Sequence, residues 1–463
     1  MKNLTEILNQ IDAIIWGPPL LILLVGAGIF LTIRLTGLQF RKFGFIFKNT
    51  LMKMFDKSDD LSSGDVTPFQ ALSTALAATV GTGNIVGVSV AILTGGPGAV
   101  FWMWLAAIFG MVTKFSEVTL AIAYRVKNPD GTYAGGPMYY IDQGLKLPWL
   151  AKLFALFAGI ATFGIGNSVQ SNAISGIMKA NFNFNPVIVG LILTVLTAIV
   201  IVGGIKSIAK VTEKLVPLMA ALYIIGAIVV IIVHGARLPH AFALIFSNAF
   251  TPQSAMGGAL GYTLLQTIRA GVSRGVFTNE AGLGSSPIAH ASASTDHPVR
   301  QGIWGVTEVF IDTIVICTMT ALVILTSGIL EGGNTGDASS LVANAFSTGF
   351  PLGKYIVTIG LALFAFSTIL GWEYYGETSM RYLFGDKISW PFRIVYVIMV
   401  FVGATIDLGA IWTIANILNG LMAFPNLIAL VGLSGVVIVL VKDFFQDPTR
   451  IRKSPDEYKH LLK

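Results

Sequence analysis

The chain has 463 residues, of which 54% are hydrophobic and only 12% are charged, and its formal net charge is +6. Soluble globular proteins carry about 25% charged residues, so this composition excludes a soluble domain. The apolar runs are continuous rather than alternating, which also excludes a transmembrane β-barrel. The single cysteine, Cys317, excludes an intrachain disulfide.

Eleven apolar segments follow one another along the chain and predict eleven transmembrane helices. A helix needs roughly 20 apolar residues to cross the hydrocarbon core of a bilayer. The connections between the segments are short, so we predict an all-α polytopic membrane protein with a single transmembrane domain over residues 1–463. The predicted spans are 12–34, 69–94, 98–124, 150–178, 187–204, 212–233, 257–292, 302–328, 353–380, 391–408 and 411–440.

Lysine and arginine gather in every second connection, which predicts the orientation of the chain in the cell membrane. Cytoplasmic loops of membrane proteins carry an excess of these cations. The connections at 125–146, 206–214 and 381–393 are rich in them, whereas "LTGGPG" and "EGGNTGDASS" on the opposite side are not. We therefore predict that the N-terminus is outside the cell and that residues 441–463 form a cytoplasmic tail.

The second span contains "AATVGTGNIVGVSVAI", in which the run Gly81–Asn84 interrupts an apolar helix. Membranes tolerate non-helical backbone only where protein buries it or a cavity receives it, so this break predicts a site. The outer half-helix starting near Gly83 offers N–H groups that suit a carboxylate. The inner half-helix ending near Val80 offers carbonyl groups that suit a monovalent cation or an ammonium group. A zwitterionic amino acid together with sodium would satisfy both ends, although glycines at helix contacts are a common alternative reading.

The seventh span, "LLQTIRAGVSRGVFTNEAGLGSSP", carries a second predicted break at Gly271, Ser273 and Gly275. Without the first span, the other ten form two sets of five with inverted topology, 69–233 and 257–440. The breaks then fall in the first helix of each set, which indicates the midplane site of a transporter. The same stretch spells Gly-x-Ser-x-Gly, but a nucleophile elbow needs a preceding strand, so we predict that the protein is not an enzyme.

Several long motifs resemble the alanine or glycine:cation symporter family, the sodium:alanine symporters. They are "TPFQALSTALAATVGTGNIVGV", "GGPGAVFWMW", "GTYAGGPMYYI", "GVFTNEAGLGSSPIAHA" and "STILGWEYYGE", and the resemblance covers nearly the whole chain. It implies a LeuT-like fold of five-plus-five inverted repeats, preceded here by one extra peripheral helix at 12–34. It also implies sodium-coupled uptake of alanine, with glycine second, by alternating access. The co-transported ion would be Na+, with no organic cofactor.

The resemblance further implies a sodium site. The motif "TVGTGN" at Thr79–Asn84 is similar to the unwound first-helix segment of LeuT-like transporters, so carbonyls at Ala77 and Val80 are implied to bind the more widely shared sodium ion. Ser367 and Thr368 match the paired hydroxyl ligands of that site. These hydroxyls are hard oxygen ligands that add no buried charge. The asparagine that ends the motif also matches a side chain that serves a second sodium in some relatives.

The implied substrate site centres on the amides of Thr82 and Gly83, which would hold the substrate carboxylate. Gln170 is expected either to contact the bound amino acid or to form interhelical hydrogen bonds. Phe277 and Trp372 are expected to form walls, and a wall rejects an added methylene by only about 1–3 kcal/mol, so selection among small amino acids is graded. The predicted substrate-binding residues are Thr79, Gly81, Thr82, Gly83, Asn84, Gln170, Ser273, Gly275, Phe277 and Trp372.

Charged residues inside the predicted spans are functional candidates by default. Lys114 and Glu117 are three residues apart and are spaced to pair with each other. Glu308 and Asp312 share a helix face, where we expect them either to line the inner vestibule or to pair with the arginines beside the second break.

Arg274 is expected to close an inner gate or to form a structural pair, and Glu280 to cap or gate the inner half-helix. Two alternative functions stay open. One is a proton-coupled symporter in which Glu308 or Asp312 titrates, and the other is a non-transporting amino-acid sensor. The paired hydroxyls favour sodium, and the short basic tail leaves no room for a sensor's output domain. The predicted partners are the small amino acid and membrane lipids, with no nucleic acid and no obligate protein partner.

Overall fold

The apolar runs fold into helices, because a backbone surrounded by lipid must satisfy its own hydrogen-bonding groups. The computed structural model describes residues 2–54, 64–251, 263–332, 338–406, 409–452, 454 and 456–462. Within those ranges, eight helices are long and apolar enough to cross a membrane, and one bent pair makes a ninth. The other two predicted spans coincide with a shorter apolar helix at 186–201 and a helix at 264–279, so the count of eleven stays a prediction.

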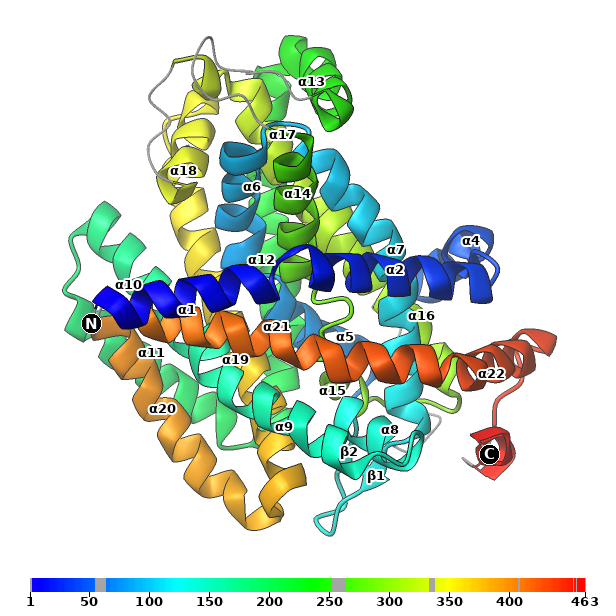
Figure 1. Ribbon diagram of the computed structural model, residues 1–463. Helices are drawn as coiled ribbons and strands as arrows, with labels where there is room; N and C mark the ends of the chain where they lie inside the picture. Colours follow the sequence, from blue (N-terminus) through cyan, green and yellow to red (C-terminus); the bar gives the residue numbers. More distant parts are fainter. Residues whose placement is uncertain are drawn as a thin grey trace.

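The N-terminal span is divided into two helices, α1 (Lys2–Ile15) and α2 (Pro18–Arg34), where a single span at 12–34 was expected. Both run beside α21 (Gly409–Gly432) on the outside of the helix bundle (Figure 1). Short helices follow α2, namely α3 (Leu38–Arg41), α4 (Phe43–Asn49) and the 3-10 turn η1 (Leu51–Lys53).

The first predicted repeat begins with the bent pair and continues through four further predicted spans. Its elements are α5 (Pro68–Thr79), η2 (Gly83–Gly87), α6 (Val88–Gly95), α7 (Ala99–Ala123), α8 (Pro137–Gln143), α9 (Pro148–Phe163), η3 (Gly164–Ser168), α10 (Val169–Phe182), α11 (Pro186–Ile201) and α12 (Gly204–Val233). A small antiparallel hairpin, β1 (Val126–Lys127) with β2 (Tyr133–Ala134), lies between α7 and α8.

The second predicted repeat contains the longest helix of the protein, α19 (Gly353–Phe384). The predicted span at 411–440 is divided at Leu433 into α21 and α22 (Ser434–Gln446). The remaining elements of the chain, within this repeat and on either side of it, are η4 (Gly235–Arg237), α13 (Leu238–Phe250), α14 (Leu264–Asn279), α15 (Pro287–His290), α16 (Pro298–Val309), η5 (Phe310–Cys317), α17 (Thr318–Ser327), η6 (Ile329–Gly332), α18 (Ala338–Gly349), η7 (Asp386–Ile388), α20 (Ser389–Thr405), α23 (Asp456–Lys459) and η8 (His460–Leu462).

Small residues bring the central helices into close contact. A Cβ atom added to Gly371 on α19 would lie 2.7 Å from the Cβ of Ala78 on α5. α7 packs against α14 and α16, and α19 packs against α5, α9 and α12. Glycine and alanine at these contacts let helix backbones approach closely, as is usual inside membranes. The two broken helices therefore lie at the centre of the bundle, between α7 and α19.

Candidate functional site

The first predicted break is confirmed. α5 ends at Thr79, Val80 is extended, and the second half-helix starts at Gly83 after a bend of 55°. The end of α5 leaves carbonyl groups without intrahelical partners, and the start of the next half-helix leaves N–H groups without them. The segment thus presents acceptors on one side and donors on the other, within three residues of chain.

The second break is also present, but its predicted position at Gly271–Gly275 is wrong. α14 is continuous from Leu264 to Asn279 and includes those residues. The glycines instead allow close packing on α7: a Cβ on Gly271 would lie 2.2 Å from the Ala99 carbonyl oxygen, and one on Gly275 would lie 3.3 Å from the Met103 backbone.

The actual second break comprises residues 280–286, between α14 and α15. Glu280, Gly282 and Gly284 have φ angles of +55°, +91° and +85°, which no regular right-handed helix contains. A left-handed glutamate is costly and persists only where its surroundings hold it. Here the Ser285 hydroxyl donates to the Glu280 carboxylate, and the Trp372 indole Nε1 donates to it at 3.2 Å.

The residues predicted to bind sodium lie together at the end of α5. The Ser367 hydroxyl donates to the Ala77 carbonyl oxygen at 3.1 Å, although Ala77 and Ser367 are 290 residues apart in sequence. Thr368 is next to this pair, and a Cβ on Gly81 would lie 2.7 Å from its Oγ1 atom. Val80 forms the C-cap of α5. Neutral oxygen atoms therefore surround this point.

Gln170 on α10 faces the same break. Its Nε2 atom donates to the Ile165 carbonyl at 3.0 Å, and its Oε1 atom lies 3.7 Å from where a Cβ on Gly81 would be. That Oε1 atom is buried and has no hydrogen-bond partner in the part of the chain that the structure describes. A buried acceptor without a donor is costly, so the position is suited to receive a donor from a ligand.

Asn84 closes the break from the opposite side. Its Oδ1 atom accepts from the Gly81 amide at 2.9 Å, and its Nδ2 atom donates to the Asp312 carboxylate at 2.6 Å. Thr313 donates to the other Asp312 oxygen at 2.8 Å, and Asn279 donates to Thr313 at 3.0 Å. The hydrogen bond between Asn84 and Asp312 could not be predicted from the sequence, in which the short polar run "TNEAG" is the sign of a polar site in this part of the protein.

A central cavity of about 650 Å³ opens onto the first break. Thr82, Gly83 and Phe277 line it, together with Asn172, Arg274 and Lys354. The Phe277 ring lies beside the break, since its Cδ1 atom would be 3.4 Å from a Cβ on Gly83. The cavity is therefore the solvent route to the amides at the start of the second half-helix.

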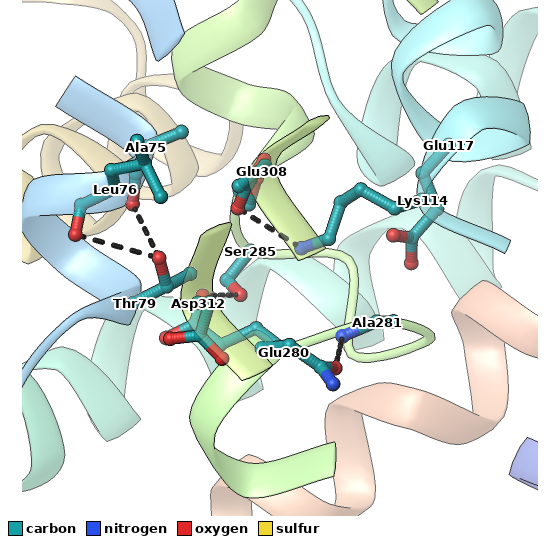
Figure 2. A network of polar contacts seen from close by, with 12 residues as sticks. Ala75, Leu76, Thr79, Lys114, Glu117, Glu280, Ala281, Ser285, Glu308 and Asp312 are labelled. Atoms are coloured by element: carbon teal, nitrogen blue, oxygen red, sulfur yellow. Dashed lines mark hydrogen bonds and ion pairs between the residues drawn. The ribbon is translucent and has the colours of Figure 1, made fainter. Parts of the chain in front are cut away.

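Of the ten predicted substrate residues, Thr82, Gly83 and Phe277 line this cavity, three more lie at the first break beside it, and four lie elsewhere. The Thr79 hydroxyl bonds back to the Ala75 and Leu76 carbonyls of its own helix (Figure 2). Ser273 lines a separate lateral cavity of about 330 Å³, and Gly275 packs against α7. Trp372 is buried one helical turn after Thr368 and donates to Glu280.

The buried charges pair differently from the prediction. The Lys114 ammonium lies 3.5 Å from the Glu308 carboxylate rather than pairing with Glu117, and Figure 2 shows the lysine side chain directed at Glu308. His290 and Ser286 also contact Glu308, at 2.9 Å and 2.7 Å. The expected pairing of Glu308 with an arginine of α14 is therefore wrong.

Glu117 holds the backbone of the second break. Its Oε1 atom accepts from the Gly282 amide at 3.0 Å and from the Asn426 side chain at 2.5 Å. Asn426 in turn donates to the Gly282 carbonyl at 2.9 Å. Together with Lys114 and Glu308, these contacts connect α7, α16 and α21 to the loop at 280–286.

Arg274 lies at both cavities rather than at an inner gate. It lines the central and the lateral cavity, and its guanidinium group is 5.9 Å from the centre of the Phe277 ring. The predicted inner-gate role is not supported by this position.

His297 closes the loop that follows the second break. Its Nδ1 atom accepts from the Val299 amide at 3.1 Å and caps α16. Burial, together with the nearby guanidinium groups of Arg452 and Arg300, lowers the pKa of His297 to about 2. A neutral group therefore holds the start of α16 throughout the physiological pH range.

Comparison with known proteins places these features in a family context. A family model described as the sodium:alanine symporter family matches residues 1–459. The sodium/alanine symporter AgcS of Methanococcus maripaludis is 47% identical over 448 residues, covering 96% of this chain and 97% of its own. An uncharacterized transporter of Haemophilus influenzae is 49% identical over 452 residues, covering 96% and 97%. The solved structure of MhsT in complex with L-phenylalanine has a TM-score of 0.57 at 15% identity, over 86% of this chain and 96% of that one.

Proposed function

The chain belongs to the sodium:alanine symporter family, a family of multi-pass transporters and not of enzymes, and from this premise we propose how its central site works. The fold is the LeuT-like fold of its structural neighbours. We propose that the protein couples entry of Na+ to uptake of alanine, and of glycine, by alternating access.

The observation that carries this proposal is the short first break between two half-helices. The Ala77 carbonyl near the end of α5 accepts from the Ser367 hydroxyl, Thr368 Oγ1 lies beside Gly81, and Thr82 and Gly83 line the central cavity. A helix N-terminus favours an anion, and a helix C-terminus favours a cation. The break is therefore suited to bind a carboxylate and a sodium ion side by side.

The coupled ion follows from the ligands. Neutral hydroxyl and carbonyl oxygens suit a hard monovalent cation, and they cannot take up a proton at physiological pH. Among the described residues, no cluster of three or more His, Cys, Asp or Glu side chains forms a transition-metal or calcium site. These properties favour sodium over proton coupling, in which Asp312 or Glu308 would have to titrate.

The size of the substrate is set by the walls of the break. Phe277 lies against Gly83, and Gln170 directs an unpaired acceptor toward Gly81, where it is suited to the substrate ammonium group. Walls this close to the two glycines favour a small substrate side chain. We therefore propose alanine as the main substrate, with glycine second.

The membrane arrangement follows from the positive-inside rule. We propose that 12–34 is a peripheral helix, that 69–233 and 257–440 are inverted repeats, and that 441–463 is cytoplasmic, with the N-terminus outside. In that orientation α5 starts on the cytoplasmic side and the central cavity opens to the outside.

The test is radiolabelled alanine uptake into proteoliposomes under an inward sodium gradient, with matched potassium and proton gradients as controls. We expect uptake under sodium alone and competition by unlabelled glycine. Uptake under the proton gradient would overturn the assignment of the ion and direct attention to the buried carboxylates. Binding without uptake under any gradient would support an amino-acid sensor instead.

A further inference from the structure

The turn between α1 and α2 inserts one aromatic side chain into the protein. Trp16 is only 7% exposed, and its indole Nε1 donates to the Asn416 carbonyl on α21 at 2.9 Å. Asn416 also donates to Asp12 at 2.7 Å, so α1 and α21 are joined on both sides of the ring. A Cβ on Gly420 would lie 3.0 Å from the indole nitrogen, which shows how closely α21 approaches it. The position of Trp16 is therefore fixed.

The fixed indole of Trp16 packs against Phe277. The two ring centroids are 6.4 Å apart with an interplanar angle of 62°, an edge-to-face arrangement that aromatic pairs favour. Phe277 in turn contacts the first break at Gly83. A continuous chain of contacts thus leads from the peripheral helix through one aromatic ring to the proposed substrate site.

The surroundings of Phe277 leave space on both sides of its ring. It lines the central cavity of about 650 Å³ and also the lateral cavity of about 330 Å³, so it forms part of the partition between them. A side chain between two cavities has few neighbours to hold one rotamer. Trp16 and Arg274 both line the lateral cavity and lie beside the ring, and the indole of Trp16 is anchored by its hydrogen bond to Asn416.

We propose that Trp16 is a positioning residue that sets the size limit of the substrate site by holding Phe277 against the first break. This inference rests on the proposed function, since it takes Phe277 as a wall of the alanine site. Without the indole, Phe277 turns into the lateral cavity and the site admits larger neutral amino acids. The peripheral helix is thereby a determinant of specificity.

The experiment compares Trp16→Ala with Phe277→Ala and with the double variant in proteoliposomes. The readout is the ratio of sodium-driven leucine uptake to alanine uptake. We expect Trp16→Ala to raise this ratio roughly 3- to 10-fold, because the free energy contributed by one aromatic pair corresponds to a factor in this range. We expect the double variant to match Phe277→Ala, because Trp16 acts only through that ring. Trp16→Phe, which keeps an aromatic edge, should restore most of the selectivity.

The matched control is Ile14→Ala, two residues before Trp16 at the end of α1, because Ile14 is 72% exposed and lines neither cavity. Its ratio should equal that of the wild type. Trp16→Leu is the second variant if the alanine variant does not fold. An unchanged ratio in folded Trp16→Leu or Trp16→Ala would overturn the proposal. So would additive effects of Trp16 and Phe277 in the double variant. If the proposed function itself is wrong, the wild type shows no sodium-driven alanine uptake, and this result differs from every outcome that bears on Trp16.

Discussion

The two broken helices of this protein use their free backbone groups in different ways. At the first break, Thr82 and Gly83 line a cavity, and the Ala77 carbonyl near the end of α5 accepts from the Ser367 hydroxyl. At the second break, side chains of the protein occupy the backbone groups: the Gly282 amide donates to Glu117, and the Ala281 amide donates to Asn279 at 3.0 Å.

This difference favours a binding role for the first break and a supporting role for the second. Unsatisfied backbone inside a membrane is costly, so a break left open must face water or a ligand. The first break is only partly closed, by Asn84 and Ser367, and Thr82 and Gly83 still line a cavity, which suits reversible binding of an ion and a zwitterion. The second break is closed by buried charges, among them Glu117 and the Lys114–Glu308 pair. Breaking such a network leaves uncompensated charge, so it suits a part that holds its shape.

The largest expected effect comes from removing the hydroxyl groups at the open break. Replacing both Ser367 and Thr368 by alanine deletes two ligands, each worth about 1.5–3 kcal/mol if they resemble hydrogen bonds to a charged group. Sodium affinity should fall roughly 100-fold or more, measured as the sodium dependence of alanine uptake. The melting temperature in detergent should change little. If the sodium dependence of uptake is unchanged, sodium does not bind at these two hydroxyl groups.

The next effect concerns stability rather than transport and arises at the closed break. Glu117→Ala leaves the Gly282 amide without its carboxylate partner, removes one of the hydrogen bonds of the Asn426 side chain and removes a neighbour of Lys114. Loss of one partner from a buried charged network costs about 3–5 kcal/mol, so the melting temperature should fall sharply. Glu117→Gln keeps one acceptor oxygen and is the matched control.

If only the first break binds sodium, the folded fraction of Glu117→Ala retains the sodium affinity of the wild type. Equal melting temperatures for Glu117→Ala and Glu117→Gln would show that the second break is not held by this carboxylate. A changed sodium affinity in folded protein would show that both breaks bind ligand.

The first break could be predicted from the sequence because its signal is local. Two glycines, a threonine and an asparagine stand together in a largely apolar run, a combination that is typical of a break. In the seventh span the glycines at 271 and 275 carry the same local signal but serve packing against Ala99 and Met103. That difference depends on a neighbouring helix and is invisible in the local sequence.

The charge pairs could not be predicted for the same reason. Lys114 and Glu117 have helical spacing that permits a pair, yet Glu308, which is 194 residues from Lys114 in sequence, lies closer to the ammonium group. Spacing along one helix limits which residues share a face but not which neighbour faces them. The LeuT-like fold, by contrast, followed from long motifs, and the solved structures bear it out.

A smaller effect tests the size of the open break with one methyl group. A Cβ on Gly83 would lie 3.0 Å from the Thr278 Cγ2 atom and 3.4 Å from the Phe277 ring, whereas one on Gly87 has nothing within 4 Å. Gly83→Ala should therefore reduce alanine uptake more than glycine uptake, with a difference of about 1–3 kcal/mol between the two substrates. The readout is the ratio of the two kcat/KM values in proteoliposomes. Gly87→Ala, on the same half-helix, should leave the ratio unchanged, and equal ratios in both variants would place the substrate elsewhere.

The smallest expected effect concerns the starts of the two broken helices, which are alike. Thr67 and Thr263 each accept from a backbone amide three residues on, at 3.1 Å and 3.2 Å, and the glutamines Gln70 and Gln266 bond back to them. These capping boxes sit on opposite sides of the membrane in the proposed topology. Loss of an N-cap costs about 1 kcal/mol.

Thr67→Ala and Thr263→Ala should each lower the melting temperature slightly, and the serine variants, which keep the hydroxyl, should not. The Gln70 side chain also donates to Glu213 at 2.7 Å, so it keeps an anchor when Thr67 is lost. We therefore expect the smaller loss at Thr67. Sodium dependence should stay at the wild-type value in both alanine variants, because each cap lies at the far end of its half-helix from the break. If Thr67→Ala alone changed the sodium dependence, the start of α5 would be coupled to the break at its other end. The difference between the binding and the supporting segment would then hold for whole half-helices and not only for the breaks.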